Sequence, residues 1–266
     1  MEDGNKGLNP DWLIPQWPAP AHVRSVCTTR AGGHSLPPYD ALNLGDHVGD
    51  LAAHVAANRA TFQNALAVKP VFLSQVHGLG VMALDQGTPD ATPADACFTT
   101  QAQLACTIMV ADCLPVLLTN AAGTQVAAAH AGWRSLAGVD GLGILENVFK
   151  TFSLSEHVGC AREAPEVIAW LGPCIGPEKF EVGADVRDAF VKHSPQAHLL
   201  FTPHAPGKWL ANLPGLARMR LAALGITQVF GNDGSREWCT VSQASRFFSH
   251  RRDGVSGRMA ASIWID

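Results

Sequence analysis

Three residues with metal-binding side chains each stand at the end of an apolar run, close to a residue that breaks regular structure. His77 precedes a glycine, Cys113 stands two residues before a proline, and His130 stands two residues before a glycine. Strand ends are rigid positions from which side chains can converge on one point, while the adjoining loops admit a substrate. One thiolate and two imidazoles make a suitable zinc set that leaves a fourth position for water or substrate. This pattern predicts a catalytic zinc centre.

The same residues support two other interpretations. Cys113 could be a thiolate nucleophile, with His130 or His77 as its base and Asp112 as the residue that orients the base. Neighbouring strand residues point to opposite faces, so Asp112 and Cys113 can share a pocket only if the chain bends before Pro115. Each ligand candidate also fits an ordinary interior, where free cysteines and hydrogen-bonded histidines are common. Because the chain lacks H-E-x-x-H and C-x-x-C pairs, all three interpretations stay open.

Two arginines are candidates for holding an anion. Arg59 falls on the apolar face of a helix that we expect to start at a capping Asp50 and to run to about Ala67. It could bind an anion there or extend to the edge of the core. Arg134 follows the strand that ends at His130, at the start of a second expected helix whose N–H groups could receive phosphate. A solvent-facing arginine near a turn is the alternative for Arg134.

The segment "GPCIGPEKFEVG" has the glycine and proline density of a shaped loop. Phe180 could stack on a flat ring in this loop, although core filling is the simpler role for a phenylalanine. Glu181 could accept a hydrogen bond from a substrate.

The elements that must position these residues alternate irregularly between strand and helix. Strand-like segments are expected at 70–78, 80–85, 104–120, 124–133, 166–176 and 226–231. Helices are expected at 142–152 and 208–225. The chain is expected to end in a pair of strands within 246–266 that turns at Asp253 and Gly254. Strict βαβ alternation is absent, so the pattern indicates a mixed α/β (α+β) chain and not a doubly wound parallel sheet. With no repeat and no linker, 266 residues are expected to form one domain.

Composition restricts the partners and the compartment. The chain is 47% hydrophobic and 16% charged with a formal net charge of -4, so a nucleic-acid partner is not expected. It has neither a membrane-length apolar segment nor a signal-peptide pattern, which predicts a cytoplasmic protein without a membrane partner. Seven cysteines, an odd number without a C-x-x-C pair, are therefore expected to be reduced thiols.

Several segments, in order, closely resemble one known family. They are "TTRAGGHSLPPYDALNLGDHVGD", "NRATF", "LSQVHG", "PADACFT", "MVADCLPVLL", "VAAAHAGWRSLAG", "WLGPCIGPEKFEVG" and "FFSHRRDGVSGRMAASIWI". They resemble the YfiH-like proteins, which are labelled multicopper polyphenol oxidase, laccase domain protein or purine nucleoside phosphorylase. The resemblance runs from Pro15 to Asp266 and implies a single four-layer α/β/β/α domain over residues 1–266 with mixed sheets. Residues 1–14 are then expected to be an extended tail.

The resemblance also implies a site and an activity. The family's metal ligands correspond to His77, Cys113 and His130, with zinc as the metal and copper as the alternative. The implied partners are a purine nucleoside (adenosine, inosine or methylthioadenosine) and inorganic phosphate, with adenosine deamination as a side activity. Either of the two arginine candidates would hold the phosphate, and Asn43 would contact the ribose or the base. The expected assembly is a monomer or a small homo-oligomer.

Three other functions stay open beside the phosphorylase. A peptidoglycan-editing hydrolase would use the Cys-His interpretation, and a non-catalytic metal-binding module would close the fourth ligand position. A polyphenol oxidase is disfavoured because multicopper sites need several H-x-H pairs, and this chain has none.

The chain departs from the family's usual pattern at Asn212, where aspartate is common, at His250, where tyrosine is usual, and in the insertion "VDGLG" after Ala137. These departures affect the expected helix start and substrate preference.

Overall fold

The computed structural model describes residues 7–155 and 166–266, and its strands form two large mixed sheets and one small one. The six-stranded sheet has the order β12-β8-β6-β7-β4-β3, the four-stranded sheet β1-β13-β5-β2, and the small sheet β10-β11-β9. The strands are β1 Val23–Cys27, β2 Lys69–Phe72, β3 Val81–Ala83, β4 Ala96–Thr99, β5 Leu104–Val110, β6 Leu114–Asn120, β7 Val126–Ala131, β8 Val167–Leu171, β9 Glu181–Gly183, β10 Phe201–Pro203, β11 Lys208–Ala211, β12 Val229–Gly231 and β13 Met259–Ile265.

Side-chain alternation explains why the two large sheets stack. In β5, Cys106 and Ile108 face the six-stranded sheet, whereas Ala105 and Met109 face outward. Strands with both faces buried read as continuous apolar runs, and β5, β6 and β7 are buried at every position.

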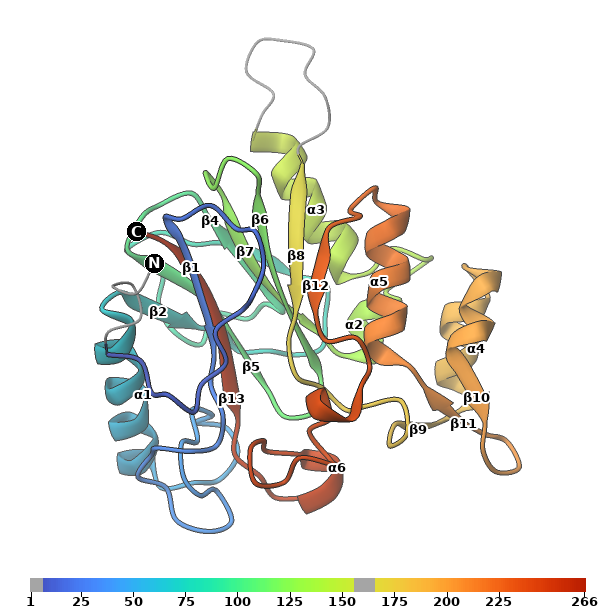
Figure 1. Ribbon diagram of the computed structural model, residues 1–266, viewed down its shortest axis with the longest axis horizontal. Helices are drawn as coiled ribbons and strands as arrows, with labels where there is room; N and C mark the ends of the chain where they lie inside the picture. Colours follow the sequence, from blue (N-terminus) through green and yellow to red (C-terminus); the bar gives the residue numbers. More distant parts are fainter. Residues whose placement is uncertain (1–6, 156–165) are drawn as a thin grey trace.

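Helices cover both outer faces. Helix α1 (Ala52–Leu66) packs on the four-stranded sheet through Phe62 and Leu66, while α3 (Ile144–Ser155) and α5 (Leu213–Ala223) cover the six-stranded sheet (Figure 1). Shorter helices are α2 Trp133–Ala137, α4 Ala184–Val191 and α6 His250–Asp253, with 3-10 turns at Pro195–Leu200 and Arg236–Trp238. The expected single mixed α/β domain with an α/β/β/α arrangement is confirmed.

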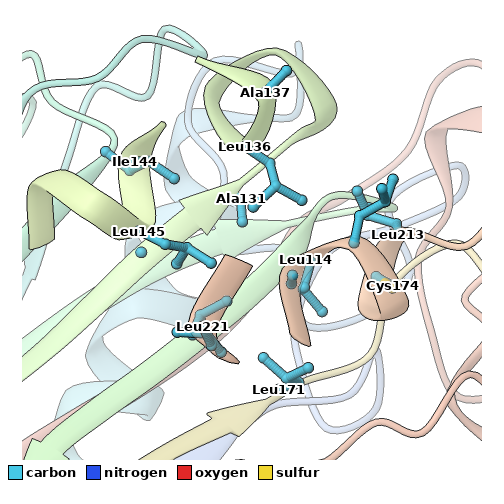
Figure 2. Close-up of a cluster of buried hydrophobic side chains, with 14 of the residues drawn as sticks. Leu114, Ala131, Leu136, Ala137, Ile144, Leu145, Leu171, Cys174, Leu213 and Leu221 are labelled. Carbon is cyan, nitrogen blue, oxygen red and sulfur yellow. The ribbon is translucent and has the colours of Figure 1, made fainter. Parts of the chain in front are cut away.

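A buried cluster between the six-stranded sheet and its helices fixes the strand ends that matter for function. Figure 2 shows Leu114 of β6 and Ala131 of β7 beside Leu213 and Leu136 from the helices. A fully buried leucine stabilises the fold by about 2 kcal/mol. Because strand neighbours point to opposite faces, these contacts direct the residues adjacent to Leu114 and Ala131 toward the space between the sheets.

Several expected elements are corrected by the structure. The run 104–120 is two strands in different sheets, β5 and β6, separated by a bend at Asp112, whose φ is 94°. Residues 208–225 begin with strand β11 before Asn212 caps α5 by accepting from Gly215 N. The expected pair of C-terminal strands is one strand, β13, preceded by the helical turn α6.

The N-terminal expectations also change. Asp50 does not cap α1, because Leu51 occupies the N-cap and the Asp50 carboxylate binds other groups of the preceding loop. Residues 7–14 are not a free tail, since Trp12 is buried against Phe62 and Leu13 pairs with Cys27.

Within the described ranges, no helix has both the length and the apolar character needed to cross a membrane.

Candidate metal centre and pocket

One loop, one bend and one strand end bring His77, Cys113 and His130 together. The strand expected to reach His77 ends at Phe72, so His77 lies in the loop after β2, where its φ is 57°. Cys113 lies in the bend that leads into β6, and His130 is the penultimate residue of β7, opposite Pro115 of β6. Their ligand atoms all lie within 4.8 Å of one another, and in the described part of the chain they form the one such cluster of His, Cys, Asp or Glu side chains.

The cluster has the geometry and donor chemistry of a zinc site. Cys113 Sγ lies 3.6 Å from His77 Nε2, and the rings of His77 and His130 are 4.7 Å apart at 66°. Donors in a tetrahedral zinc site, with bonds of about 2.0–2.3 Å, lie roughly 3.3–3.8 Å apart. The residues therefore fit zinc with small side-chain movements. Imidazole ligands also suit copper, but one three-ligand cluster does not make a multicopper site.

A buried aspartate that the sequence analysis missed orients the cluster. Asp95 Oδ1 accepts a 2.9 Å hydrogen bond from His130 Nδ1, which leaves Nε2 of His130 toward the other two ligands. The same carboxylate accepts from the backbone N–H groups of Val76, His77 and Gly78 at 3.2, 2.8 and 2.6 Å. Burial raises the pKa of Asp95, but these hydrogen bonds outweigh it and lower the pKa. The available signal was an acidic residue placed directly before an apolar strand.

The electrostatics of the cluster favour a thiolate. Burial raises the pKa of the Cys113 thiol, but the neighbouring His130 and His77 lower it to about 6. Burial lowers the pKa of His130, whereas the charge of Cys113 and the hydrogen bond to Asp95 raise it to about 9. A thiolate is the form of cysteine that binds metal or attacks a substrate.

Asp112 does not orient a histidine, so this part of the nucleophilic hypothesis is corrected. The bend does place Asp112 and Cys113 in one pocket. However, the Asp112 carboxylate accepts from Thr240 Oγ1 at 2.5 Å and from Arg251 N at 2.6 Å. Asp112 therefore fixes the start of α6, which carries Arg251, and Asp95 is the residue that orients His130.

A pocket of about 420 Å³ opens above the three ligands. This volume is within the usual range for small-molecule sites. Its lining residues are His47, Gln75, His77, Met109, Val110, Ala111, Asp112, Cys113, His130, Trp133, Ile175, Phe180, Leu213, His250, Arg251 and Arg258. Sequence analysis assigned no role to Arg251, Arg258 or His47, although all three lie in segments that resemble the family. Arg251 is in α6, and the other two lie in loops distant in the sequence.

The two predicted anion-binding arginines do not line this pocket. Arg59 stacks over Phe72 with its guanidinium carbon 4.2 Å from the ring centre, and it pairs with Asp46 at 3.2 Å. Arg134 is exposed and stacks on Trp133. Its helix α2 has only five residues, so its N-terminus offers little of the dipole that a longer helix supplies.

The remaining predicted contacts divide between pocket and scaffold. Phe180 lines the pocket as a mostly buried wall residue. Glu181 does not line it, is exposed, and lies 3.6 Å from His204. Asn43 is completely buried, and its side chain binds Gly45, Asp50 and Arg258 N. Asn43 is therefore not among the residues that line the pocket, and it is bound to Arg258, which is.

Comparison with known proteins identifies the family. Residues 24–266 match the family described as Multi-copper polyphenol oxidoreductase laccase. The chain belongs to this family. Within it, the chain is 48% identical over 257 residues to "Purine nucleoside phosphorylase YfiH" of Escherichia coli, with 95% of this chain and 98% of the relative covered. A relative from Pseudomonas aeruginosa, also named a purine nucleoside phosphorylase, is 45% identical over 255 residues, covering 96% and 98% of the two chains.

Solved structures in the family have the same fold. A Neisseria meningitidis protein is 43% identical, with a TM-score of 0.82 over 96% of this chain and 99% of its own. YlmD from Geobacillus stearothermophilus is 31% identical, with a TM-score of 0.82 over 92% of each chain. The resemblance to YfiH-like proteins is confirmed.

Proposed function

We propose that this protein is a zinc-dependent purine nucleoside phosphorylase that cleaves adenosine, inosine and methylthioadenosine and deaminates adenosine as a side activity. The observation that carries the proposal is the His77, Cys113 and His130 cluster within a pocket of about 420 Å³. Close relatives named purine nucleoside phosphorylase support it. Copper is the alternative metal. Nucleoside substrates and reduced thiols fit a cytoplasmic location, which we also propose. The proposed assembly is a monomer or a small homo-oligomer.

We assign different residues of the pocket different roles in phosphorolysis. A phosphate oxygen forms a bond to the ribose anomeric carbon while the bond from that carbon to the purine nitrogen breaks, and the proton that hydrogen phosphate loses goes to the departing purine nitrogen. A zinc ion held by His77, Cys113 and His130 would supply Lewis-acid polarisation of a substrate oxygen. Asp95 holds His130 in the tautomer that presents Nε2, and Phe180 and Trp133 form walls that can orient the flat base.

Metal content and phosphate-dependent release of free base from adenosine test this proposal together. Wild-type protein is expected to hold about one zinc per chain and to release adenine only when phosphate is present. Cys113→Ala is expected to lose both. Cys27→Ala, which removes a buried thiol outside the pocket, is the matched control and is expected to retain both. No base release from zinc-loaded wild type at any phosphate concentration would overturn the proposal.

A second candidate is the peptidoglycan-editing hydrolase, and one geometric observation favours it. Asp95, His130 and Cys113 resemble an orienting acid, a base and a nucleophile, with Asp95 Oδ1 2.9 Å from His130 Nδ1. A hydrolase of this kind would release serine from a muropeptide precursor without metal. Retention of that release in chelator-treated protein, with loss in Cys113→Ala, would support the hydrolase in place of the phosphorylase.

A further inference from the structure

Two arginines of the pocket differ from most other described arginines in having no acidic partner. Pairs with carboxylates are formed by Arg24, Arg30, Arg59, Arg187, Arg220 and Arg252. Arg258 Nη1 donates to the carbonyls of Ser256 and Gly257 at 2.9 and 3.0 Å, and Arg251 Nη1 donates to the carbonyl of Glu181 at 3.1 Å. Within the described residues, neither guanidinium has a carboxylate at ion-pair distance.

Arg258 lies beside the metal-binding residues. It directly precedes β13, whose first residue, Met259, pairs with Val110 at the end of β5. That register places Arg258 next to the bend that contains Asp112 and Cys113, and all three line the same pocket. Burial lowers the pKa of Arg258, while the nearby charges of Cys113 and Asp112 raise it.

No carboxylate of the pocket forms an ion pair with Arg258, although the charges of Cys113 and Asp112 lie near it. Asp112 is the one carboxylate among its lining residues, all of which are described, and both of its oxygens already accept hydrogen bonds. His47, on the loop after Asn43, lines the same pocket. Burying an unpaired guanidinium costs free energy, so an anion would stabilise it there.

The N-terminal loop is built to hold Arg258 in place. Asn43 Oδ1 accepts from Arg258 N at 2.9 Å, and Leu44 N donates to the carbonyl of Arg258 at 3.0 Å. Gly45 packs against the arginine stem so closely that a Cβ there would lie 2.7 Å from Arg258 Cγ. Asn43 is fixed in turn, because its Nδ2 donates to Asp50 Oδ2 at 2.9 Å. This long loop therefore positions the side chain of Arg258 at the pocket.

We infer that Arg258 binds the inorganic phosphate co-substrate beside the metal-binding cluster, and that Asn43 is its positioning residue. This inference rests on the proposed phosphorylase function. Nη2 and Nε of Arg258 donate to no described residue, and the planar fork of a guanidinium matches two oxygens of a phosphate. Phosphate held by Arg258 would share one pocket with His47 and the three metal-binding residues, which all line it.

Steady-state kinetics with phosphate and adenosine varied separately test the inference. Arg258→Gln is expected to raise the KM for phosphate at least about 10-fold while the KM for adenosine changes less than about twofold. Arg258→Lys, which keeps the charge but not the fork, is expected to fall between wild type and Arg258→Gln. The matched control is Arg187→Gln, on a surface arginine paired with Asp188, and it is expected to leave both KM values unchanged. An unchanged phosphate KM in folded Arg258→Gln would overturn the inference.

A second measurement uses only wild-type protein and inorganic phosphate, so it does not depend on the folding of a variant or on turnover. Phenylglyoxal modifies accessible arginines, and peptide mapping measures the rate at each one. Saturating phosphate is expected to slow modification of Arg258 at least about fivefold and to leave Arg187 unchanged. Equal rates at Arg258 with and without phosphate would overturn the inference.

The two measurements also separate this inference from the proposed function. Base release with a phosphate KM that does not respond to Arg258→Gln would retain the phosphorylase and reject Arg258 as the phosphate site. Protection of Arg258 in a wild-type protein that releases no base would retain the phosphate site and reject the phosphorylase.

Discussion

Asp95 and His130 form a buried pair joined by two hydrogen bonds: the Asp95 carboxylate accepts from His130 Nδ1 at 2.9 Å, and the Asp95 backbone carbonyl accepts from His130 N at 2.7 Å. Because three N–H groups of the loop around His77 donate to the same carboxylate, one residue fixes two of the three metal-binding side chains. Residues that hydrogen-bond to metal ligands typically contribute 10- to 100-fold to metal affinity. Asp95 is therefore expected to affect metal affinity although it is not itself a ligand.

Asp95→Asn is expected to weaken zinc binding about 10- to 100-fold, because an amide cannot accept all four hydrogen bonds and can present the wrong atom to His130. Competition with a chelator of known affinity measures the change. Asp85→Asn, at an exposed turn aspartate, is the control and is expected to retain wild-type affinity. Wild-type zinc affinity in Asp95→Asn would show that the carboxylate does not support the ligands.

Gly132→Ala is expected to disturb the cluster without removing a ligand. A Cβ at position 132 would lie 2.9 Å from His77 Cδ2 and 3.1 Å from Cys113 Sγ, so both side chains would have to move. We expect at least about a 10-fold loss of zinc affinity, with normal folding by circular dichroism. Gly80→Ala is the control, because its Cβ would meet nothing closer than 3.7 Å. Equal zinc affinity in the two variants would show that the cluster tolerates the displacement.

Asn43→Ala separates a supporting role from a substrate contact. Loss of a fully buried, fully bonded amide is expected to lower the free energy of unfolding by about 2 kcal/mol. In the folded variant the KM for phosphate should rise more than the KM for adenosine, because the backbone N–H of Arg258 loses Asn43 Oδ1, the side-chain oxygen that accepts its hydrogen bond. A selective rise in the KM for adenosine would instead indicate that Asn43 contacts the nucleoside.

Asp50 makes the N-terminal loop sensitive to acid. Burial raises the pKa of Asp50, but hydrogen bonds from Asn43, Ser35 and Leu51 N outweigh it and hold the pKa below its ordinary value of 3.8. The ionised carboxylate therefore stabilises the folded state above about pH 4, and this stabilisation is lost as the pH falls through the folded-state pKa.

Urea unfolding of wild type and Asp50→Asn at several pH values between 7 and 3 measures this contribution. The variant is expected to be about 1–2 kcal/mol less stable at pH 7, with a difference that shrinks below pH 4. A difference that stays constant over this range would exclude the titration of Asp50 as its source.

Much of the fold follows from local patterns. The runs at 80–85 and 124–133 contain strands β3 and β7, and the helix expected at 142–152 is present as α3. The runs at 70–78 and 166–176 are strands only in their first part, because β2 ends at Phe72 and β8 ends at Leu171. The boundaries that failed depend on context: the bend at Asp112 needs a positive φ stabilised by distant partners, and α6 replaces an expected strand because Ser249 caps it by accepting from Arg252 N. From the sequence alone, a serine that caps a helix cannot be distinguished from one that extends a strand, because the difference depends on which other segments pack beside it.

The sequence by itself determined the three ligand candidates, because residue type and a position after an apolar run and close to a glycine or proline are both local properties. The tertiary structure decided which groups surround them. Pairing of β6 with β7 sets Pro115 opposite His130, and pairing of β13 with β5 carries Arg258 to the same pocket from the far end of the chain. Arg59 was an anion candidate by its position on a helix face, but its carboxylate partner is visible only after folding. Charge neutralisation depends on distances in space, and spacing along the chain does not encode those distances.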